Sequence, residues 1–169
     1  MRSYSADGAA LFGRHMELFD WCVSTGRVPL SARTFQPGPE HAADVARLNA
    51  LGLGGMAWHM VDRFRAVAGT DVDHSMAVAE GDRLIGFILS RAVAADTLHV
   101  HSHVIAPTHR EGWAQAMLHH DFMKFVTAKG FRRFTFEAGD AHPVTRKTAK
   151  RVGATLAAER TMMMRQLTP

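Results

Sequence analysis

The segment from Leu98 to Ile105 alternates between two sets of positions. One set holds Leu98, Val100, Ser102 and Val104, and the other holds His99, His101, His103 and Ile105. A period of two residues is typical of a β-strand, because successive side chains of a strand point to opposite faces of its sheet. The pattern therefore predicts a strand that carries three histidines on one face.

A helix is predicted soon after this strand. From Gly112 to Ala128, the apolar face returns at every third or fourth position: Trp113, Ala116, Met117, His120, Met123 and Val126, with Phe122 at its edge. Between strand and helix, Pro107 interrupts backbone pairing and Gly112 adds no side chain, so main-chain N–H groups are open to a bound group. A helix N-terminus suits a phosphate or pyrophosphate, although an ordinary turn fits the same residues.

Residues 109–114, which read H-R-E-G-W-A, add a motif to this turn. With Gly112 and Ala114 at its two small positions, the motif resembles the coenzyme A signature R/Q-x-x-G-x-G/A of the GNAT N-acetyltransferase superfamily. His109 stands where that family usually has arginine or glutamine. Residues 129–131, K-G-F, fall where the family's helix ends.

A second register of the motif places Arg110 at the basic position. It moves Trp113 and Gln115 onto the small positions, so we prefer the first register. In the first register, Met117 and Leu118 fall where the family has its paired leucines.

The resemblance covers most of the chain after residue 31. It implies strands at 32–36, 76–80, 84–94, 132–138 and 156–167, and helices at 41–49, 56–68 and 143–152, in addition to the strand and helix described above. Gly81 and Asp82 would join the hairpin, and Gly153 would end the last helix. The expected fold class is α/β (α+β), with a GNAT-like mixed, mostly antiparallel sheet of six to seven strands and helices on both faces.

Residues 1–30 lie outside the resemblance and are expected to form an N-terminal helical extension, followed by an acyl-CoA-binding acyltransferase domain over residues 31–169. Apolar residues recur at helical spacing in the extension: Ala9, Phe12, Met16, Phe19 and Val23. They predict one extra amphipathic helix from Gly8 to Ser24.

Composition agrees with one domain. A chain of 169 residues that is 47% hydrophobic can form one core but is short for two domains. Cys22 is the one cysteine, so no internal disulfide is possible, and no apolar run reaches the length of a membrane span. We expect a cytoplasmic protein without a membrane partner. The net charge of +4 accompanies no recognisable nucleic-acid module, so we expect no nucleic acid as a partner.

The resemblance implies acetyl-CoA as cosubstrate. The residues that it places against the coenzyme are Val104, Ile105, Ala106, His109, Arg110, Glu111, Gly112, Trp113, Ala114 and His142. In the family, main-chain groups near the end of the motif strand hold the pantetheine arm and the thioester carbonyl. His142 stands at the position of the family's usual asparagine.

Acetyl transfer from a thioester to an amine needs a base for the amine, a donor for the oxyanion and an acid for the leaving thiolate. His101 and His103 are the first candidates for the base, because imidazole titrates near neutral pH, and Glu137 is the second. The structural alternatives are that the histidines fill space and that Glu137 pairs with Arg132 or Arg133. A metal site on the three histidines is less favoured than either a catalytic or a structural role, so no metal is expected.

The acid has no obvious side chain in this sequence. Ala149 stands where the family commonly has a tyrosine that protonates the thiolate. The one tyrosine is Tyr4, so the usual acid is absent unless the N-terminal segment folds back to supply it. Thr148, His142 or water are the other candidates.

We therefore expect an N-acetyltransferase that moves an acetyl or other acyl group from acetyl-CoA to a primary amine by direct attack. The acceptor would be a small molecule or a peptide, and a homodimer is possible. The alternative is a non-catalytic module that binds coenzyme A or acyl-CoA as a sensor, which the missing tyrosine favours.

Overall fold

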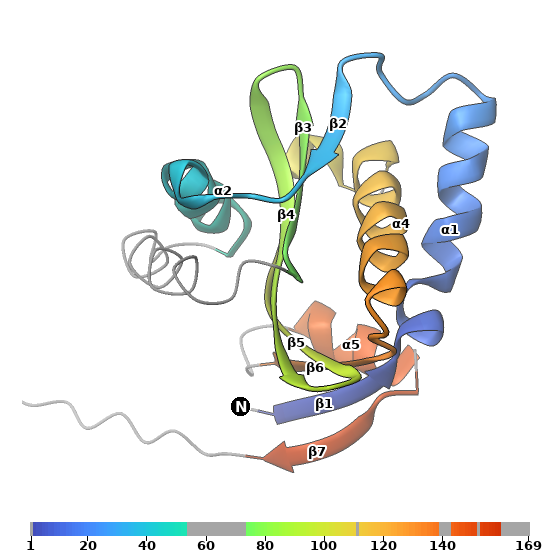
Figure 1. The fold of residues 1–169 in the computed structure, drawn as a ribbon, viewed down its shortest axis with the longest axis vertical. Coiled ribbons are helices and arrows are strands. Elements are labelled where there is room, and N and C mark those ends of the chain that lie inside the picture. Colours follow the sequence, from blue (N-terminus) through green and yellow to red (C-terminus); the bar gives the residue numbers. More distant parts are fainter. Residues whose placement is uncertain (1, 54–73, 111, 139–142, 152, 160–169) are drawn as a thin grey trace, which may run out of the picture.

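The computed structural model describes residues 2–53, 74–110, 112–138, 143–151 and 153–159 (Figure 1). In chain order the elements are β1 (Arg2–Asp7), α1 (Gly8–Ser24), β2 (Ala32–Phe35), the short 3₁₀ helix η1 (Pro39–His41), α2 (Ala42–Leu53), β3 (Met76–Glu80), β4 (Arg83–Ala94), β5 (Thr97–Ile105), the 3₁₀ helix η3 (Pro107–His109), α4 (Trp113–Ala128), β6 (Arg133–Ala138), α5 (Pro143–Arg151) and β7 (Thr155–Glu159).

The described strands form one sheet in the order β2-β3-β4-β5-β6-β1-β7. Every neighbouring pair is antiparallel except β5 and β6, which run parallel. A parallel pair needs a crossover connection, and α4 provides it between β5 and β6. The mixed, mostly antiparallel sheet expected from the sequence is confirmed.

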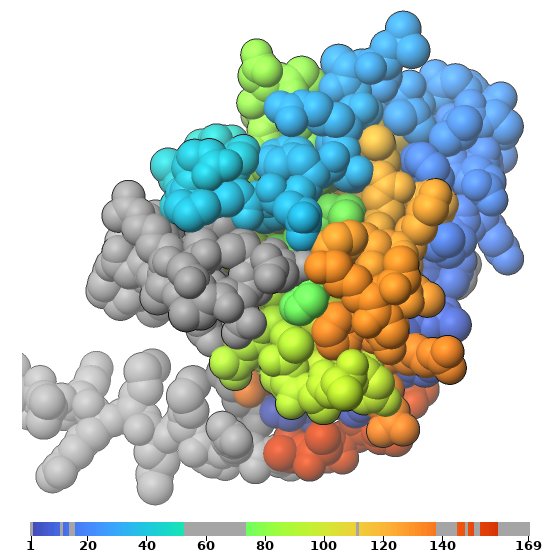
Figure 2. Space-filling view, in the orientation of Figure 1, coloured from blue at the N-terminus to red at the C-terminus, as the bar shows by residue number. Residues whose placement is uncertain are grey.

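Helices cover both faces of this sheet (Figure 1). On β5, the Ser102 hydroxyl donates to Asn49 of α2, while the next residue, His103, contacts His119 of α4. Because neighbouring strand side chains point to opposite faces, α2 and α4 lie on opposite sides of the sheet. The α1 helix packs on α4, and Figure 2 shows the two along the same flank of the molecule.

The main apolar core surrounds the central strands. Its fully buried aromatic side chains are Phe87 of β4, Phe122 of α4 and Phe134 of β6. Phe12 of α1 reaches the same core, and its ring centroid lies 5.3 Å from that of Phe134. Burying each such ring stabilises the fold by about 1.5–3 kcal/mol, so α1 is tied to the sheet by apolar packing.

The α1 helix has the bounds that the sequence predicts, Gly8 to Ser24. It begins where the Asp7 carboxylate accepts hydrogen bonds from the main-chain N–H groups of Ala9 and Ala10, at 2.9 and 3.3 Å. Such a cap satisfies N–H groups that have no partner inside the helix. None of the described helices is long and apolar enough to cross a membrane.

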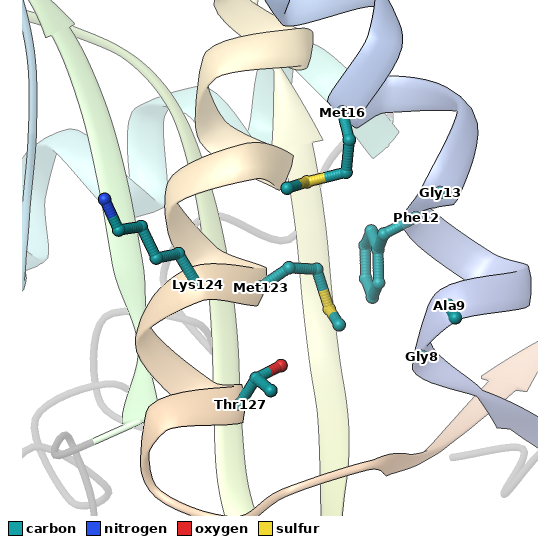
Figure 3. A pocket seen from close by; sticks show the side chains of 8 residues that line it. All are labelled: Gly8, Ala9, Phe12, Gly13, Met16, Met123, Lys124 and Thr127. Carbon is teal, nitrogen blue, oxygen red and sulfur yellow. The ribbon is translucent and has the colours of Figure 1, made fainter.

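An apolar hollow of about 320 Å³ opens between α1 and α4 (Figure 3). Phe12 and Met16 of α1 and Met123 of α4 line it, while the amine of Lys124 points away from α1. The hollow presents almost no polar group.

Some elements differ from the sequence-based expectation or lie partly or wholly beyond the described residues. The strand β1 is one that sequence analysis does not predict, and it pairs with both β6 and β7. The helix expected at 56–68 lies outside the described residues, and of the strand expected at 156–167 the structure describes the part up to Glu159.

Candidate functional site

The sheet opens between its two parallel strands. In the described part of the chain, the β5–β6 ladder runs from Thr97 paired with Arg133 to Val100 paired with Phe136, whereas β5 continues to Ile105. The other edge of β6 pairs with β1 along its whole length, from Arg133 to Ala138. Among the described strands, the last residues of β5 thus have β4 on one side and no partner strand on the other, which leaves main-chain groups open to a ligand.

A β-bulge marks the start of this opening. Leu89 of β4 pairs with Ser102, but the next residue, Ser90, pairs with Val100, so His101 is an extra residue on β5. A bulge bends the strand and breaks the alternation of its side chains. The expectation that His99, His101 and His103 share one face is therefore wrong.

The bulge divides the histidines between the two faces. Phe134 of β6 packs against Phe122 of α4, so Thr135 points to the opposite face. His99 pairs with Thr135 in register, and its Nδ1 lies 3.0 Å from the Thr135 hydroxyl oxygen. The rings of His99 and His101 are in contact, with centroids 4.7 Å apart. Both histidines therefore lie away from α4.

His103 points to the α4 side. Its Nε2 lies 3.0 Å from Nε2 of His119, which projects from the buried face of α4. His103 is exposed, whereas the side chain of His119 is 4% exposed. The pair therefore connects the open part of β5 with the interior of the protein.

Glu137, the second candidate base, lies on the face opposite α4. It follows Thr135 by two residues on β6, is exposed, and has its Oε1 3.5 Å from the Ser3 hydroxyl of β1. The neighbouring Arg133 has Asp96 as its carboxylate partner, at 3.7 Å. The three candidate bases are thus on two faces, with His101 and Glu137 on one and His103 on the other.

The turn after β5 is fixed by several polar contacts. The Ala106 N–H donates to the Ile85 carbonyl of β4 at 2.7 Å. The Arg110 guanidinium donates to the carbonyls of Ile105 and Gly52, each at 3.4 Å, and so joins the turn to α2. These contacts hold the N-terminus of α4 beside the end of β5.

His109, at the motif's basic position, has an acidic neighbour. Its Nε2 lies 3.3 Å from the Glu80 carboxylate of β3, and its ring meets the edge of Trp113 at a centroid distance of 6.0 Å. Trp113 packs on the apolar core, as expected from the sequence. His109 therefore anchors the turn to β3 as well as lying next to the helix N-terminus.

Gly112 is the N-cap residue of α4, and no side chain caps it. The first N–H groups of a helix have no partner inside the helix, and their dipoles attract an anion. A Cβ on Gly112 would come no nearer than 3.9 Å to other atoms, so the space in front of the helix is open. Ala114 is fully buried, which suits the motif's second small position.

The position of the missing tyrosine is filled by apolar packing. Ala149 of α5 is fully buried in a small cluster with Ala6 of β1 and Phe136 of β6. Tyr4 of β1 packs on the same cluster and stacks on Phe136, with ring centroids 5.6 Å apart. The N-terminal segment does fold back, and it brings the tyrosine to the cluster that contains Ala149.

Some expected site residues lie outside the described residues. They are Glu111 of the motif and His142, and Thr148 has no described side chain. Within the described ranges, no three histidine, cysteine or acidic side chains gather as a metal site.

Sequence analysis missed His119. The sequence pattern predicts His120 on the apolar face, but the buried face contains His119 with Ala116 and Phe122, each three residues apart. His120 is half-buried and binds Asp121 instead, at 2.7 Å. The spacing of the apolar residues themselves was the signal that could have assigned the buried face to His119.

Comparisons with known proteins are consistent with this geometry. No protein-family model matches the chain, and no curated protein matches it in sequence. Solved structures do match in three dimensions. The aminoglycoside N-acetyltransferase AAC(6')-Iy in complex with coenzyme A superposes with a TM-score of 0.56 and 16% identity, over 83% of this chain and 99% of that chain.

Two further acetyltransferase-type structures show the same arrangement. Ard1 from Thermoplasma volcanium has a TM-score of 0.56 and 14% identity, over 72% of this chain and 81% of its own. Diaminobutyrate acetyltransferase EctA from Paenibacillus lautus, with its substrate and coenzyme A, has a TM-score of 0.53 and 15% identity, over 69% and 71%. The chain therefore has the fold of the GNAT N-acetyltransferases.

Proposed function

We propose that this protein is an acyl-CoA-dependent N-acetyltransferase. It transfers an acetyl group from acetyl-CoA to a primary amine by direct attack. The observation that carries the proposal is the opening beside β5, which begins after Val100 and lies next to the uncapped N-terminus of α4. The open edge of β5 suits an extended polar chain, and the N-terminus of α4 suits a phosphate.

The coenzyme would lie along the open edge of β5. Main-chain groups of Val104, Ile105 and Ala106 would hold the pantetheine arm. The pyrophosphate would lie at the N-terminus of α4, near Gly112 and the exposed Arg110. His109, Trp113 and Ala114 would shape this turn, and the contacts expected from Glu111 and His142 stay predictions.

Direct attack is supported by the place of the one cysteine. A route through an acyl-enzyme needs an accessible nucleophile. Cys22 is 1% exposed and lies near the end of α1, so its thiol is packed in the interior. The amine would therefore attack the thioester carbonyl itself. Its proton would pass to one of the candidate bases, His101, His103 or Glu137.

The similar structures support a class of acceptor. The AAC(6')-Iy enzyme is an aminoglycoside N-acetyltransferase, and EctA is described in complex with L-2,4-diaminobutyric acid. Both act on amines, which supports an amine acceptor here, as a small molecule or a peptide. Cytoplasmic location, a homodimer and the absence of a metal stay predictions.

The test begins with calorimetric titration of acetyl-CoA into the protein, followed by thiol release against a panel of primary amines. Gly112→Asp is the informative variant. Aspartate is a good N-cap, so the helix keeps its stability, but the added carboxylate repels a phosphate. We expect at least about a tenfold loss of acetyl-CoA affinity, equal to about 1.4 kcal/mol.

Ala43→Asp is the matched control. Ala43 is exposed in the first turn of α2, so the variant places the same charge at a different helix N-terminus. Its acetyl-CoA affinity should equal that of the unmodified protein. If Gly112→Asp binds acetyl-CoA as tightly as this control, the proposed phosphate site is wrong.

A non-catalytic coenzyme A sensor is the second candidate. The observation that favours it is Ala149, whose small, fully buried side chain has no acidic group. A sensor would bind acetyl-CoA and would release no thiol with any amine of the panel. An enzyme would release thiol in proportion to the amine.

A further inference from the structure

Two imidazoles face each other at the open part of β5. The 3.0 Å distance between Nε2 of His103 and Nε2 of His119 is that of a hydrogen bond, so one proton lies between the two nitrogens. Two N–H groups cannot face each other at this distance. One ring must therefore donate and the other accept, and in either case Nδ1 of His103 is the atom that is directed away from His119.

The surroundings hold the inner imidazole in place. The ring of Phe12 meets the His119 ring edge-on, with centroids 4.9 Å apart, and the side chain is 4% exposed. Of the titratable groups nearby on α4, His120 and Asp121 bind each other. A second charge on the buried ring would break the hydrogen bond, whereas a single charge strengthens it.

The position of the pair relates it to the sulfur of a bound thioester. In acetyl-CoA the sulfur lies between the phosphates and the acyl group. His119 is six residues into α4, about 9 Å along the helix from Trp113. In a coenzyme whose phosphates lie at the N-terminus of α4, the sulfur is nearer to those phosphates than the acyl carbon is, and the proposal places this sulfur on the sheet face that α4 covers. His103 lies on that side, while His101 and Glu137 lie on the other.

We propose that His103, held in orientation by His119, donates the proton to the leaving thiolate. His101 or Glu137, on the opposite face, then accepts the proton of the attacking amine. This inference rests on the proposed function. It assigns His103 to the task of the family's tyrosine, at whose position this chain has Ala149, and it makes His119 a positioning residue.

The proton count balances. The amine nitrogen forms a bond to the carbonyl carbon, and the C–S bond breaks. The base on the far face takes one proton from the amine, while Nδ1 of singly charged His103 gives one to the sulfur. The products are the N-acetyl amine and free coenzyme A thiol. Because His103 is exposed, water restores its proton after each cycle.

The test is the pH dependence of kcat with acetyl-CoA and the best amine of the panel. An acid that must be protonated makes kcat fall at high pH, and a base makes it rise from low pH. We expect His103→Gln to lower kcat by about a hundredfold, and to abolish the fall at high pH but not the rise. The KM for acetyl-CoA should stay unchanged.

His119 is tested by a pair of variants. His119→Leu removes the partner of His103 and should lower kcat by about tenfold, as is typical for loss of an orienting group. His119→Gln keeps an amide oxygen that accepts the His103 Nε2–H, so it should restore most of kcat. Equal loss in both variants would overturn the positioning role. His120→Gln is the control, because this histidine of the same helix binds Asp121 and has no part in the proposed transfer, and it should leave kcat unchanged.

The alternatives give different results. If His103→Gln abolishes the rise at low pH, His103 is the base and the inference is wrong. It is also wrong if the profile does not change, or if Tyr4→Phe rather than His103→Gln abolishes the fall at high pH. Absence of thiol release by the unmodified protein with every amine would instead overturn the proposed function.

Imidazole ¹⁵N NMR measures the tautomers of His103 and His119 in the absence of any reaction. Neutral His103 should carry its hydrogen on Nε2, and His119→Leu should return it to the mixture of tautomers of a free histidine. A mixture in the unmodified protein would show that the hydrogen bond is absent. That result would overturn the inference even if the protein is an acetyltransferase.

Discussion

Ala149 is the residue at which this chain departs most from the family that it resembles. Its side chain is fully buried against Ala6 and Phe136, so the position has the volume of a methyl group. Tyr4 stacks on Phe136 from β1 and occupies space beside it. The local packing has therefore adapted to a small residue, and a tyrosine could not be restored without moving these neighbours.

Ala149→Tyr should destabilise the protein by about 1–3 kcal/mol, because a large ring would overpack the cluster. Lys150→Tyr, at the exposed neighbouring position, places the same ring in solvent and should change stability little. Chemical denaturation of the two variants measures the difference. Equal stability would mean that the cluster is loosely packed.

At the residue scale, the motif could be predicted from the sequence, but the contact and the faces of the histidines could not. The motif residues could be named because the turn and the helix are local features. The partnership of His103 with His119 joins a strand to a helix, and no spacing along the chain indicates it. His101 and His103 lie on opposite faces of the sheet because of a β-bulge, and the alternating pattern of the sequence does not reveal that bulge.

At the scale of elements, the helices with strong patterns were the most predictable. The α1 helix has both predicted bounds, because five apolar residues and a capping aspartate define it locally. The strand β1 was missed. Its six residues alternate Tyr4 and Ala6 with Ser3 and Ser5, a signal too short to separate from a loop.

Two glycines of α1 should respond to substitution with opposite signs. A Cβ at Gly8 would lie 2.5 Å from the Phe134 ring, so Gly8→Ala should destabilise by about 1–3 kcal/mol. A Cβ at Gly13 meets nothing within 4 Å. Gly13→Ala should stabilise by about 0.5–1 kcal/mol, because alanine loses less backbone entropy than glycine.

Thermal or chemical unfolding of the two glycine variants separates these effects, since both changes add one methyl group to the same helix. Stabilisation by both would mean that the start of α1 has room beside Phe134. Destabilisation by both would mean that the hollow next to Gly13 is closed by packing.

At the scale of the molecule, β1 connects the two ends of the described chain. It lies between β6 and β7 and pairs with both, so every strand from β2 to β7 belongs to one continuous sheet. The division into a 1–30 extension and a 31–169 domain stays a prediction. Removing residues 1–30 would remove a strand that is paired on both sides.

Ser5→Pro tests the role of β1. Ser5 pairs with Thr135 on one side and Thr155 on the other. Proline has no N–H to donate, so a carbonyl loses its partner and the protein should lose roughly 1–3 kcal/mol. Ser5→Ala keeps the N–H and is the control. Equal unfolding midpoints for the two variants would mean that β1 contributes little.

The place of β1 sets an order on folding during synthesis. Ser3 and Glu137 meet across 134 residues of chain, so β1 leaves the ribosome long before β6 and β7, the two strands that pair with its edges. Contacts between such distant segments are slow to form, and an uncovered strand invites association with other chains. Slow translation or a heat shock would therefore endanger this protein most while β6 and β7 are still unmade.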